Sequence, residues 1–576
     1  MHQVKKQVPA ASDRQAAGGE TEFSRRDFLR GGVAAGVVGG VGLGAVYFGY
    51  GSSLPNPVRV GLIGTGDEGG VLLGAINPDY VQVVAIADIR PSNVYRAFHG
   101  DDSSVSAAEA RPGLIKKYGY SSESDARRQI AVYTDGYEQL LEDPQVEGVI
   151  IALPLHLHAE ASIKAMRRGK HVLCEKLMAH RVHQCKEMAR QSRSLDKVLA
   201  IGHQRHYSML YDNVAHMIRR GLIGDIHHIR AQWHRGNMPG SDSWQPPLPD
   251  STLESQLASA QQKSDQLLQR LAEMAQQETG AWERGWSTER QWAEAQRRWN
   301  RIRLLDKDVH AEKYGYQPVE LVGPDGKKTI LSPLEELIRW RLFERTGGGL
   351  MAELGSHQLD AASIFISKAH GDGTKKVHPL AVYGVGGRHI FPLDRQVDDH
   401  VYCGYEFPAP DYESDPKNKR IVVTYSSING NGFGGYGEVV MGTKGTIIVD
   451  REYDVQLLAD DRQTAVQAAR SGPVVLDTTE SGYAPTAQRQ EATGPISRGY
   501  TEQIEHWAWC IRNRDPLNEP RCDAQTGLAD AVIALVSNMA IRQQRRFLFD
   551  PEWFDVNSDA TPEGIAPDEN RSEYKV

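Results

Sequence analysis

The sequence predicts an α/β protein with two domains. In the first half of the chain, short apolar runs alternate with helical stretches, which is typical of a parallel sheet covered by helices. The second half contains strand-like segments separated by loop residues, which predict an α+β domain with a large, mostly antiparallel open sheet. The length of 576 residues supports this division, because a single hydrophobic core rarely grows so large. The strands expected in the second domain are Ala381–Arg388, Asp399–Phe407, Arg420–Ser426 and Glu438–Val449.

Composition and charge exclude several classes of protein. The formal net charge is −8 and the pI is near 6.2, which argues against a nucleic-acid-binding protein, because such proteins need a basic surface. The five cysteines are scattered without a CxxC pair, so the sequence predicts neither a zinc site nor a disulfide framework. Cys510 and Cys522 could pair in an oxidising compartment, but we expect free thiols and no metal centre.

Residues 1–55 have the features of an export signal. The run Ser24–Arg30 reads SRRDFLR, and a Gly/Ala/Val-rich stretch from Gly31 to about Gly51 follows it. Paired arginines before a mildly apolar segment are typical of a bacterial twin-arginine signal, which predicts a periplasmic protein. The apolar stretch is also long enough to cross a bilayer, which takes about 20 residues. A released protein and one tethered to the membrane both fit this segment.

The next segment has the pattern of a dinucleotide-binding Rossmann domain, which we place at residues 57–205. A short apolar strand leads into Gly64, Gly66 and Gly69, a GxGxxG sequence that opens a helix. In this motif the first glycine allows a tight turn, the second lets the backbone approach a pyrophosphate, and the third lets helix and strand pack closely. The following strand ends at Asp88, near the spacing expected for an acid that binds the adenosine ribose.

Two neighbouring side chains bear on the choice of cofactor. A carboxylate at Asp88 favours NAD, because it would repel the 2′-phosphate of NADP. Arg90 could instead meet such a phosphate, so NADP stays open. We assign both residues to cofactor binding.

Two further strands bring polar residues to the same edge of the predicted sheet. The apolar run at 146–153 is followed by Pro154 and His158, and the run at 170–174 is followed by Glu175 and Lys176. Ligands of an open parallel sheet bind at the carboxyl ends of its strands. These four residues are therefore expected to join the glycine loop in one site.

The stretch Gly347–Asp360, GGGLMAELGSHQLD, is the expected source of proton transfer. Glu353 and His357 are spaced i, i+4, and His357 and Asp360 are spaced i, i+3, so one helix face would carry all three. A histidine beside a carboxylate is a common acid–base pair near neutral pH. We predict that His357 is the base or acid and that Glu353 orients it. An ordinary buried helix is the alternative.

Taken together, these motifs resemble the Gfo/Idh/MocA oxidoreductase family, named for glucose–fructose oxidoreductase and inositol dehydrogenase. The family pattern of a strand, Pro-x-x-x-His, GKHV and then EKP is matched by VEGVIIALPLHLHAEASIKAMRRGKHVLCEKL. The resemblance covers about 59–235 and 347–450. Two positions depart from it: Leu177 replaces the proline after the lysine, and Glu353 replaces an aspartate.

The resemblance implies an NAD(P)-dependent oxidoreductase that acts on the CH–OH group of a sugar or polyol. It implies that Lys176 is catalytic and lies near the nicotinamide. It also suggests substrate contacts at Arg205, Tyr207 and Asp360. The alternative for Arg205 and Tyr207 is a surface loop of mixed polar residues. The alternative for Asp360 is a role in helix packing. The open sheet of this family often forms subunit contacts, so a homo-oligomer is expected.

The C-terminal domain, placed at residues 206–550, contains an insertion relative to this plan. Apolar residues from Leu253 to Met274 recur at helical spacing, which predicts a helical insertion at about 250–310. A small hairpin is expected at Val322–Leu331 around a PDG turn. The tail, 551–576, is polar and is expected to be disordered after Asp555.

Export places a constraint on the chemistry. A free NAD pool is not expected outside the cytoplasm, so we expect a tightly bound cofactor that is regenerated within each cycle. Hydride exchange between two sugars fits this constraint. An NAD-dependent glycosidase-like reaction through transient sugar oxidation is an alternative. A sugar-binding or membrane-tethered protein without catalysis is the third reading.

Overall fold

The protein is described by a computed structural model. The model describes residues 43–51, 53–250, 252–255, 258–259, 262, 297–452, 454–459, 486–490 and 498–576. The predicted twin-arginine motif and most of the predicted helical insertion lie outside the described residues.

The N-terminal sheet has the topology of a Rossmann fold, as predicted. Within the described ranges it contains six parallel strands in the order β3-β2-β1-β4-β5-β6. The order reverses between β1 and β4, and ligands of such sheets bind outside the strand ends at this point. The strands are β1 (Val58–Ile63), β2 (Val81–Ala87), β3 (Ala131–Tyr133), β4 (Gly148–Ile151), β5 (His171–Cys174) and β6 (Leu199–Ile201).

Helices connect these strands. The stretch from Val105 to Tyr118 forms two short helices, because Pro112 precedes the second and the backbone turns at Gly113. The connecting helices are α3 (Asp67–Ala75), α4 (Pro91–His99), α5 (Val105–Ala110), α6 (Gly113–Tyr118), α7 (Glu123–Ala126), α8 (Glu138–Glu142), α9 (His158–Arg167) and α10 (Val182–Ser194).

The second sheet confirms the prediction of a large, mostly antiparallel open sheet. In the described part of the chain its order is β16-β15-β14-β13-β7-β12-β11-β10-β17, and only the β7–β12 pair is parallel. The strand expected at Glu438–Val449 is a hairpin of two strands. The members are β7 (Ile226–His234), β10 (Ala381–Gly387), β11 (His400–Pro408), β12 (Arg420–Ile428), β13 (Tyr436–Gly442), β14 (Gly445–Asp450), β15 (Asp454–Ala459), β16 (Thr486–Gln490) and β17 (Phe547–Leu548).

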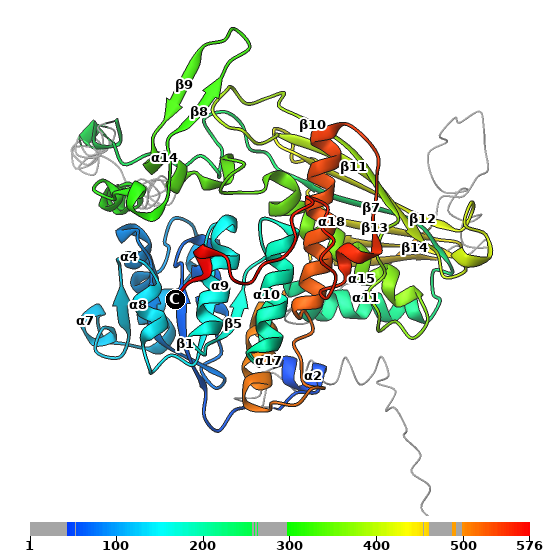
Figure 1. The fold of residues 1–576 in the computed structure, drawn as a ribbon, viewed down its shortest axis with the longest axis horizontal. Coiled ribbons are helices and arrows are strands. Elements are labelled where there is room, and N and C mark those ends of the chain that lie inside the picture. The colour runs from blue at the N-terminus through cyan, green and yellow to red at the C-terminus, as the bar shows by residue number, and fades with distance from the viewer. Residues whose placement is uncertain are drawn as a thin grey trace, which may run out of the picture. The chain divides into compact units, whose positions relative to one another are not determined.

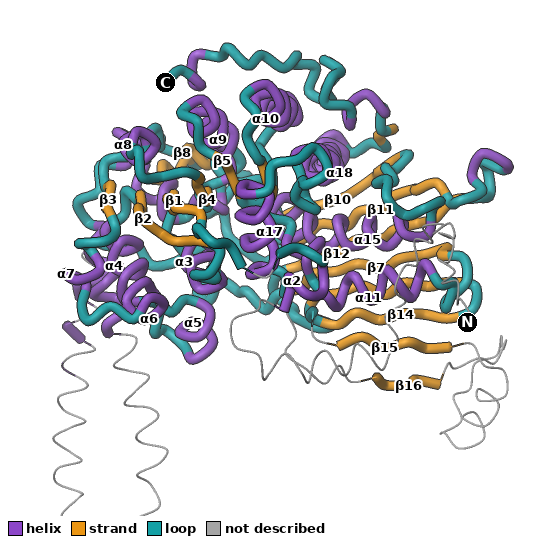
Figure 2. Tube along the Cα trace, turned by 90° about the horizontal axis from the view of Figure 1, so that it is seen from below, coloured by secondary structure: helices purple, strands orange, loops and turns teal. Residues whose placement is uncertain are grey.

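Three helices pack beside this sheet: α11 (Met209–Arg219), α15 (Ser356–Ala369) and α18 (Ala524–Gln543) (Figure 2). By length and composition, α18 is the only helix among the described residues that could cross a membrane, and 72% of its apolar 18-residue window is buried inside the protein, where the helix contacts β10 and α10. The predicted small hairpin is confirmed as β8 (Val319–Val322) and β9 (Lys328–Leu331) (Figure 1).

The predicted domain boundary at residue 206 does not separate the hydrophobic cores of the two domains. Helix α17 (Tyr500–Arg512) contacts β1, β2 and α3 of the N-terminal sheet. Its Trp507 is fully buried there, and a Cβ at Gly148 would lie 2.9 Å from the indole. The short helix α2 (Leu43–Phe48) contacts α17 in turn. The N-terminal domain is therefore completed by residues from near both ends of the described chain.

The prediction of a disordered tail is wrong. The last residues run along α9 and α10 (Figures 1 and 2), and Tyr574 is fully buried with its hydroxyl donating to Glu187 Oε2 at 2.5 Å. The ammonium of Lys186 donates to the carbonyl oxygens of Glu552, Ser558 and Ala560 at 2.7–2.9 Å. The polar composition of the tail suggested disorder, but buried polar contacts hold this segment in place.

Candidate functional site

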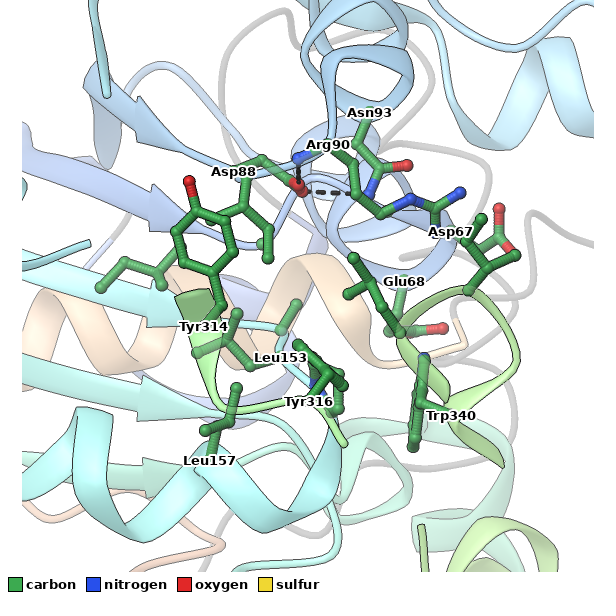
Figure 3. A pocket seen from close by; sticks show the side chains of 18 of the residues that line it. Asp67, Glu68, Asp88, Arg90, Asn93, Leu153, Leu157, Tyr314, Tyr316 and Trp340 are labelled. Carbon is green, nitrogen blue, oxygen red and sulfur yellow. Dashed lines mark hydrogen bonds between the residues drawn. The ribbon is translucent and has the colours of Figure 1, made fainter. Parts of the chain in front are cut away.

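A cavity of about 650 Å³ lies at the carboxyl ends of β1, β2, β4 and β5 (Figure 3). This is the edge at which the sequence predicted a dinucleotide. The predicted residues that line the cavity are Gly64, Gly66, Asp88, Arg90, Pro154, His158, Glu175, Lys176 and Glu353.

The three glycines fit a dinucleotide at this edge. Gly64 has a φ of +85°, and a Cβ there would lie 2.4 Å from the carbonyl oxygen of Ala152. A Cβ at Gly69 would lie 2.1 Å from the carbonyl oxygen of Gly64, so this glycine allows helix and strand to pack. Gly66 differs, because it lines the cavity at the N-terminus of α3, with its nearest neighbour atom 3.6 Å from an added Cβ. The loop thus leaves open the space that a pyrophosphate would take.

Asp88 is held rigidly at the end of β2. Its Oδ2 accepts hydrogen bonds from Thr65 N at 2.7 Å and Asn93 Nδ2 at 3.1 Å, and its Oδ1 accepts one from Arg90 N at 2.9 Å. Burial raises the pKa of this carboxyl above its ordinary value, although the hydrogen bonds from Arg90 and Thr65 oppose that effect. The carboxyl group is therefore fixed where an adenosine ribose would lie.

Arg90 is already engaged by an acid that the sequence analysis did not single out. The Arg90 guanidinium pairs with Asp306, with Nε and Nη2 at 2.9 and 2.8 Å from Oδ2. Asp306 is 1% exposed and also accepts hydrogen bonds from Ser92 N and Oγ. No sequence signal links these residues, because more than 200 positions separate them.

Lys176 and Glu353 meet at the cavity wall. Lys176 Nζ donates to the Glu353 carbonyl oxygen at 3.0 Å and lies 3.9 Å from Glu353 Oε2. The same Oε2 accepts a hydrogen bond from Arg341 Nε at 3.0 Å. Burial alone would raise the pKa of Glu353, but Lys176 and Arg341 outweigh it and hold the pKa below its ordinary value. Glu353 is thus an anion between two cations.

The predicted pairing of Glu353 with His357 needs correction. Residues Met351–Gly355 form a π-helical turn before α15, and i→i+5 winding takes residues four apart out of line. His357 instead lies 5.7 Å from the Trp233 ring and 6.2 Å from the His203 ring, centroid to centroid. Burial, with Lys176 and Arg205 nearby, lowers the pKa of His357 well below its ordinary value. The imidazole is therefore neutral near pH 7, and its Nδ1 has no hydrogen-bond partner among the described residues.

The three predicted substrate contacts are not among the residues that line the cavity. The Arg205 guanidinium is 1% exposed and pairs with Glu438 and Glu452 at 3.2 and 3.0 Å. The Tyr207 hydroxyl is fully buried and accepts a hydrogen bond from the backbone N–H of Arg521 at 2.7 Å. These contacts join segments far apart in the sequence, so both residues anchor the domain junction.

Asp360, the third of these residues, belongs to a buried charge network. Its Oδ1 lies 2.9 Å from His206 Nε2 and 3.0 Å from Lys376 Nζ, and Lys376 also pairs with Asp530. Two sets of residues here have the types that ligate metals, with ligand atoms within 4.8 Å of one another: His203, Cys522 and Asp530, and His206, Asp360 and Asp530. The Lys376 ammonium already supplies the positive charge between the two carboxylates.

His158 and Glu175 support the cavity wall. The ring nitrogens of His158 lie 2.8 Å from the carbonyl oxygens of Leu177 and Leu153, which ties together the chain segments after β4 and β5. Burial and the neighbouring Glu68 raise the pKa of Glu175 well above its ordinary value. Its Oε1 is buried and has no hydrogen-bond partner in the described part of the chain. A protonated Glu175 could therefore donate to a bound ligand.

Residues beyond the Rossmann domain close the cavity. Tyr314 and Tyr316 follow the insertion, and Trp340 precedes the glycine stretch (Figure 3). Trp299, Ile302 and Arg303 add a further wall. The helical spacing of the insertion was the available signal for this wall, but that spacing alone does not place the insertion at the cofactor site.

Comparisons with known proteins agree with a dinucleotide-binding domain in this part of the chain. Residues 58–203 match the family model described as "Oxidoreductase family, NAD-binding Rossmann fold" (GFO_IDH_MocA). The chain is 31% identical over 175 residues to a "Glycosyl hydrolase family 109 protein" of Stenotrophomonas maltophilia, which covers 30% of this chain and 35% of that protein. It is 30% identical over 129 residues to the 1,5-anhydro-D-fructose reductase of Ensifer adhaerens, with 22% and 36% covered.

The extent of these matches is limited. The chain spans about a third to a half of the length of the first curated relatives it matches. The crystal structure of an oxidoreductase domain protein from Kribbella flavida has a TM-score of 0.50 and 15% identity, covering 86% of this chain and all of that one, which shows a shared fold. The family match, the strand order and the glycine loop agree: residues 58–203 form a Rossmann domain that matches the NAD-binding domain of the Gfo/Idh/MocA oxidoreductase family.

Proposed function

We propose that this protein is an NAD-dependent oxidoreductase that acts on the CH–OH group of a sugar or polyol. The position of Lys176 carries the proposal, because its ammonium lies on the wall of the dinucleotide cavity and is held there by Glu353. The similarity to a 1,5-anhydro-D-fructose reductase supports a carbohydrate as the substrate.

The protein supplies the proton chemistry. NAD, when bound, supplies the hydride acceptor. Lys176 Nζ donates a hydrogen bond to the substrate oxygen and stabilises negative charge as the hydroxyl proton leaves. His357, kept neutral by burial and by nearby cations, has an Nδ1 that can take up a proton. Glu353 sets the position of Lys176 through its backbone carbonyl and its carboxylate.

The charges near Asp88 support NAD over NADP. The Asp88 carboxyl group is fixed by hydrogen bonds at the place expected for the adenosine ribose. Arg90, the residue that could have met a 2′-phosphate, pairs with Asp306. A 2′-phosphate would have to compete with the buried Asp306 carboxylate for the Arg90 guanidinium.

We also propose that the protein is exported and retains its cofactor. The motif at Ser24–Arg30 supports a periplasmic location by the twin-arginine route, with a membrane tether as the variant form. A compartment without free NAD requires that one cofactor molecule serve many cycles. The walls around the cavity suit such retention.

A glycosidase-like reaction is the second candidate. The observation that favours it is the similarity to a glycosyl hydrolase family 109 protein over 175 residues. In that reaction the sugar is oxidised, eliminates its leaving group, adds water in its place and is reduced again, so no net NADH forms.

One experiment separates these functions. The full chain is purified, its retained cofactor is identified by mass spectrometry, and a panel of sugars and aryl glycosides is followed at the nicotinamide absorbance. Reduction of NAD by a sugar supports the oxidoreductase. Release of the aryl group without net NADH selects the glycosidase-like reaction. A folded protein that neither retains nor binds a dinucleotide would instead be a non-catalytic binding protein, and the proposal would fail.

A further inference from the structure

One wall of the dinucleotide cavity does not come from the Rossmann domain. The helical segment at 297–303 lines the cavity with Trp299, Ile302 and Arg303 and continues into the 3₁₀ turn η3 (Leu304–Asp306). This segment belongs to the insertion that distinguishes the chain from the family plan. The turn η3 contacts α4, the helix that carries Asn93, and a Cβ at Gly66 would lie 3.6 Å from the Asn93 side chain.

The segment is pinned to the Rossmann domain next to Asp88. The buried Asp306 carboxylate binds the Arg90 guanidinium and also accepts hydrogen bonds from Ser92 N and Oγ at 2.9 and 2.6 Å. These partners lie at the start of α4, immediately after β2. The position of Arg303, three residues before Asp306, is therefore determined by the cofactor-binding domain itself.

Arg303 is a cation without an acid of its own in the described chain. Its guanidinium lies 4.9 Å from the Trp299 ring centroid, and Arg96 contacts the same ring at 4.7 Å. The nearby carboxylates form ion pairs with other arginines. Asp67 pairs with Arg96 at 2.6 Å, and Asp101 pairs with Arg96 and Arg111, both at 2.8 Å. The closest anions are therefore shared among other arginines.

The surroundings of Arg303 favour the binding of an anion. Burial and the neighbouring Arg96 and Arg90 lower its pKa to about 10, although Asp67 opposes them. A desolvated guanidinium gains most from a charged acceptor, and its planar fork matches a phosphate. Asp67, which interacts electrostatically with Arg303, is the residue directly after Gly66 in the phosphate-binding loop.

We propose that Arg303 binds a phosphate group of the dinucleotide, so that the end of the insertion forms part of the cofactor site and slows cofactor release. The phosphate is either the pyrophosphate common to NAD and NADP or the 2′-phosphate of NADP. The inference rests on the proposed function, because it requires a dinucleotide in this cavity.

The test compares two arginines of the same segment. Arg303→Gln removes the proposed contact, and Arg298→Gln is the matched control, because Arg298 is 56% exposed and pairs with Asp102 on the surface. Dissociation constants and dissociation rates of NADH and NADPH are measured with the full chain by nicotinamide fluorescence. Where cofactor copurifies, the fraction retained after extended dialysis is measured for each protein. Thermal unfolding without added cofactor shows whether each variant is folded. The variant Arg303→Lys shows how much of the cofactor affinity a single positive charge restores.

Arg303→Gln should weaken binding by about 10- to 100-fold, the usual effect of losing a charge-assisted hydrogen bond, while Arg298→Gln stays at the wild-type value. An equal loss for both cofactors identifies the pyrophosphate, and a loss confined to NADPH identifies the 2′-phosphate. If folded Arg303→Gln binds both cofactors like the wild type, the inference is overturned and the proposed function stands. If the wild type binds neither cofactor, both fail.

Discussion

Lys176 Nζ donates a 3.0 Å hydrogen bond to the backbone carbonyl of Glu353, and the carboxylate of the same residue lies 3.9 Å from that ammonium. This relationship joins the end of β5 to the π-helical turn before α15. It makes Glu353 a partner of Lys176, whereas the sequence predicted His357 as its partner.

Lys176→Met should lower turnover by about 10²- to 10⁴-fold, because it removes the ammonium and keeps most of the side-chain stem. Cofactor affinity, measured by fluorescence, should change little. Glu353→Gln should impair the wild type but add almost nothing in the Lys176→Met background, since two residues that act together are not additive. Fully additive effects of the two substitutions would contradict the pairing.

His357→Ala should lower turnover by ~10²-fold or more if this residue is the general base. Because Glu353 does not bind His357, the effect of Glu353→Gln should persist in the His357→Ala background. Single-turnover kinetics of the loaded enzyme provide the measurement, and unchanged cofactor retention provides the control. Near-wild-type turnover would remove His357 from the mechanism.

His378 should make stability depend on pH. Its ring stacks on Phe554 at 3.9 Å, and burial, with Lys376 nearby, lowers its pKa to about 4. The ordinary pKa is about 6.5, so the unfolded chain binds more protons than the folded protein between about pH 6.5 and 4. This residue therefore removes stability as the pH falls through that window.

The replacement His378→Phe should keep the stack and abolish this titration. Between about pH 7 and 5, the variant should lose less unfolding free energy than the wild type, by roughly 1–2 kcal/mol. Urea unfolding at both pH values measures the difference. Identical losses in the two proteins would show that His378 does not carry the effect.

Tyr574→Ala should destabilise the protein by about 3 kcal/mol or more, because it leaves a cavity and removes the hydrogen bond to the buried Glu187. Ile565→Ala, at a 42% exposed position of the same segment, is the control and should cost far less. Urea unfolding distinguishes them. Equal, small effects would mean that the C-terminal segment does not contribute to the stability of the fold.

The exposed side chains of the open sheet support a homo-oligomer. Tyr383 and Val385 of β10 are 57% and 58% exposed, and Tyr402 of the neighbouring β11 is 47% exposed. Exposed apolar patches of this kind are typical of subunit interfaces. The double variant Tyr383→Glu/Val385→Glu should reduce the mass measured by light scattering to that of one chain. Leu517→Glu, at a 92% exposed position, should leave the oligomer intact. A wild-type monomer would refute the proposal.

Local sequence rules predicted the parts of the site that depend on a single strand and the loop after it. Gly64, Asp88 and Lys176 each follow a buried parallel strand, and the sheet brings such positions together. Glu353, which was predicted to orient His357, lies in the cavity wall. Its partner there is Lys176, because the i, i+4 rule assumes an α-helix and the turn is π-helical.

Contacts between distant segments were beyond such rules. Arg205 carries the charge expected of a substrate contact, but its charge is used by Glu438 and Glu452. Asp306 reaches Arg90 across more than 200 residues, and no periodicity signals that contact. The polar tail suggested disorder by composition, although its carbonyl groups are the partners of the buried Lys186.

The packing of α17 and of the last residues against the N-terminal domain has a consequence for biosynthesis. Trp507 and Tyr574, both fully buried against that domain, are synthesised long after its six strands. Domains often fold one after another during translation, beginning with the first. Here the nascent Rossmann domain lacks part of its core until these later segments are made, so the two domains complete their folding together.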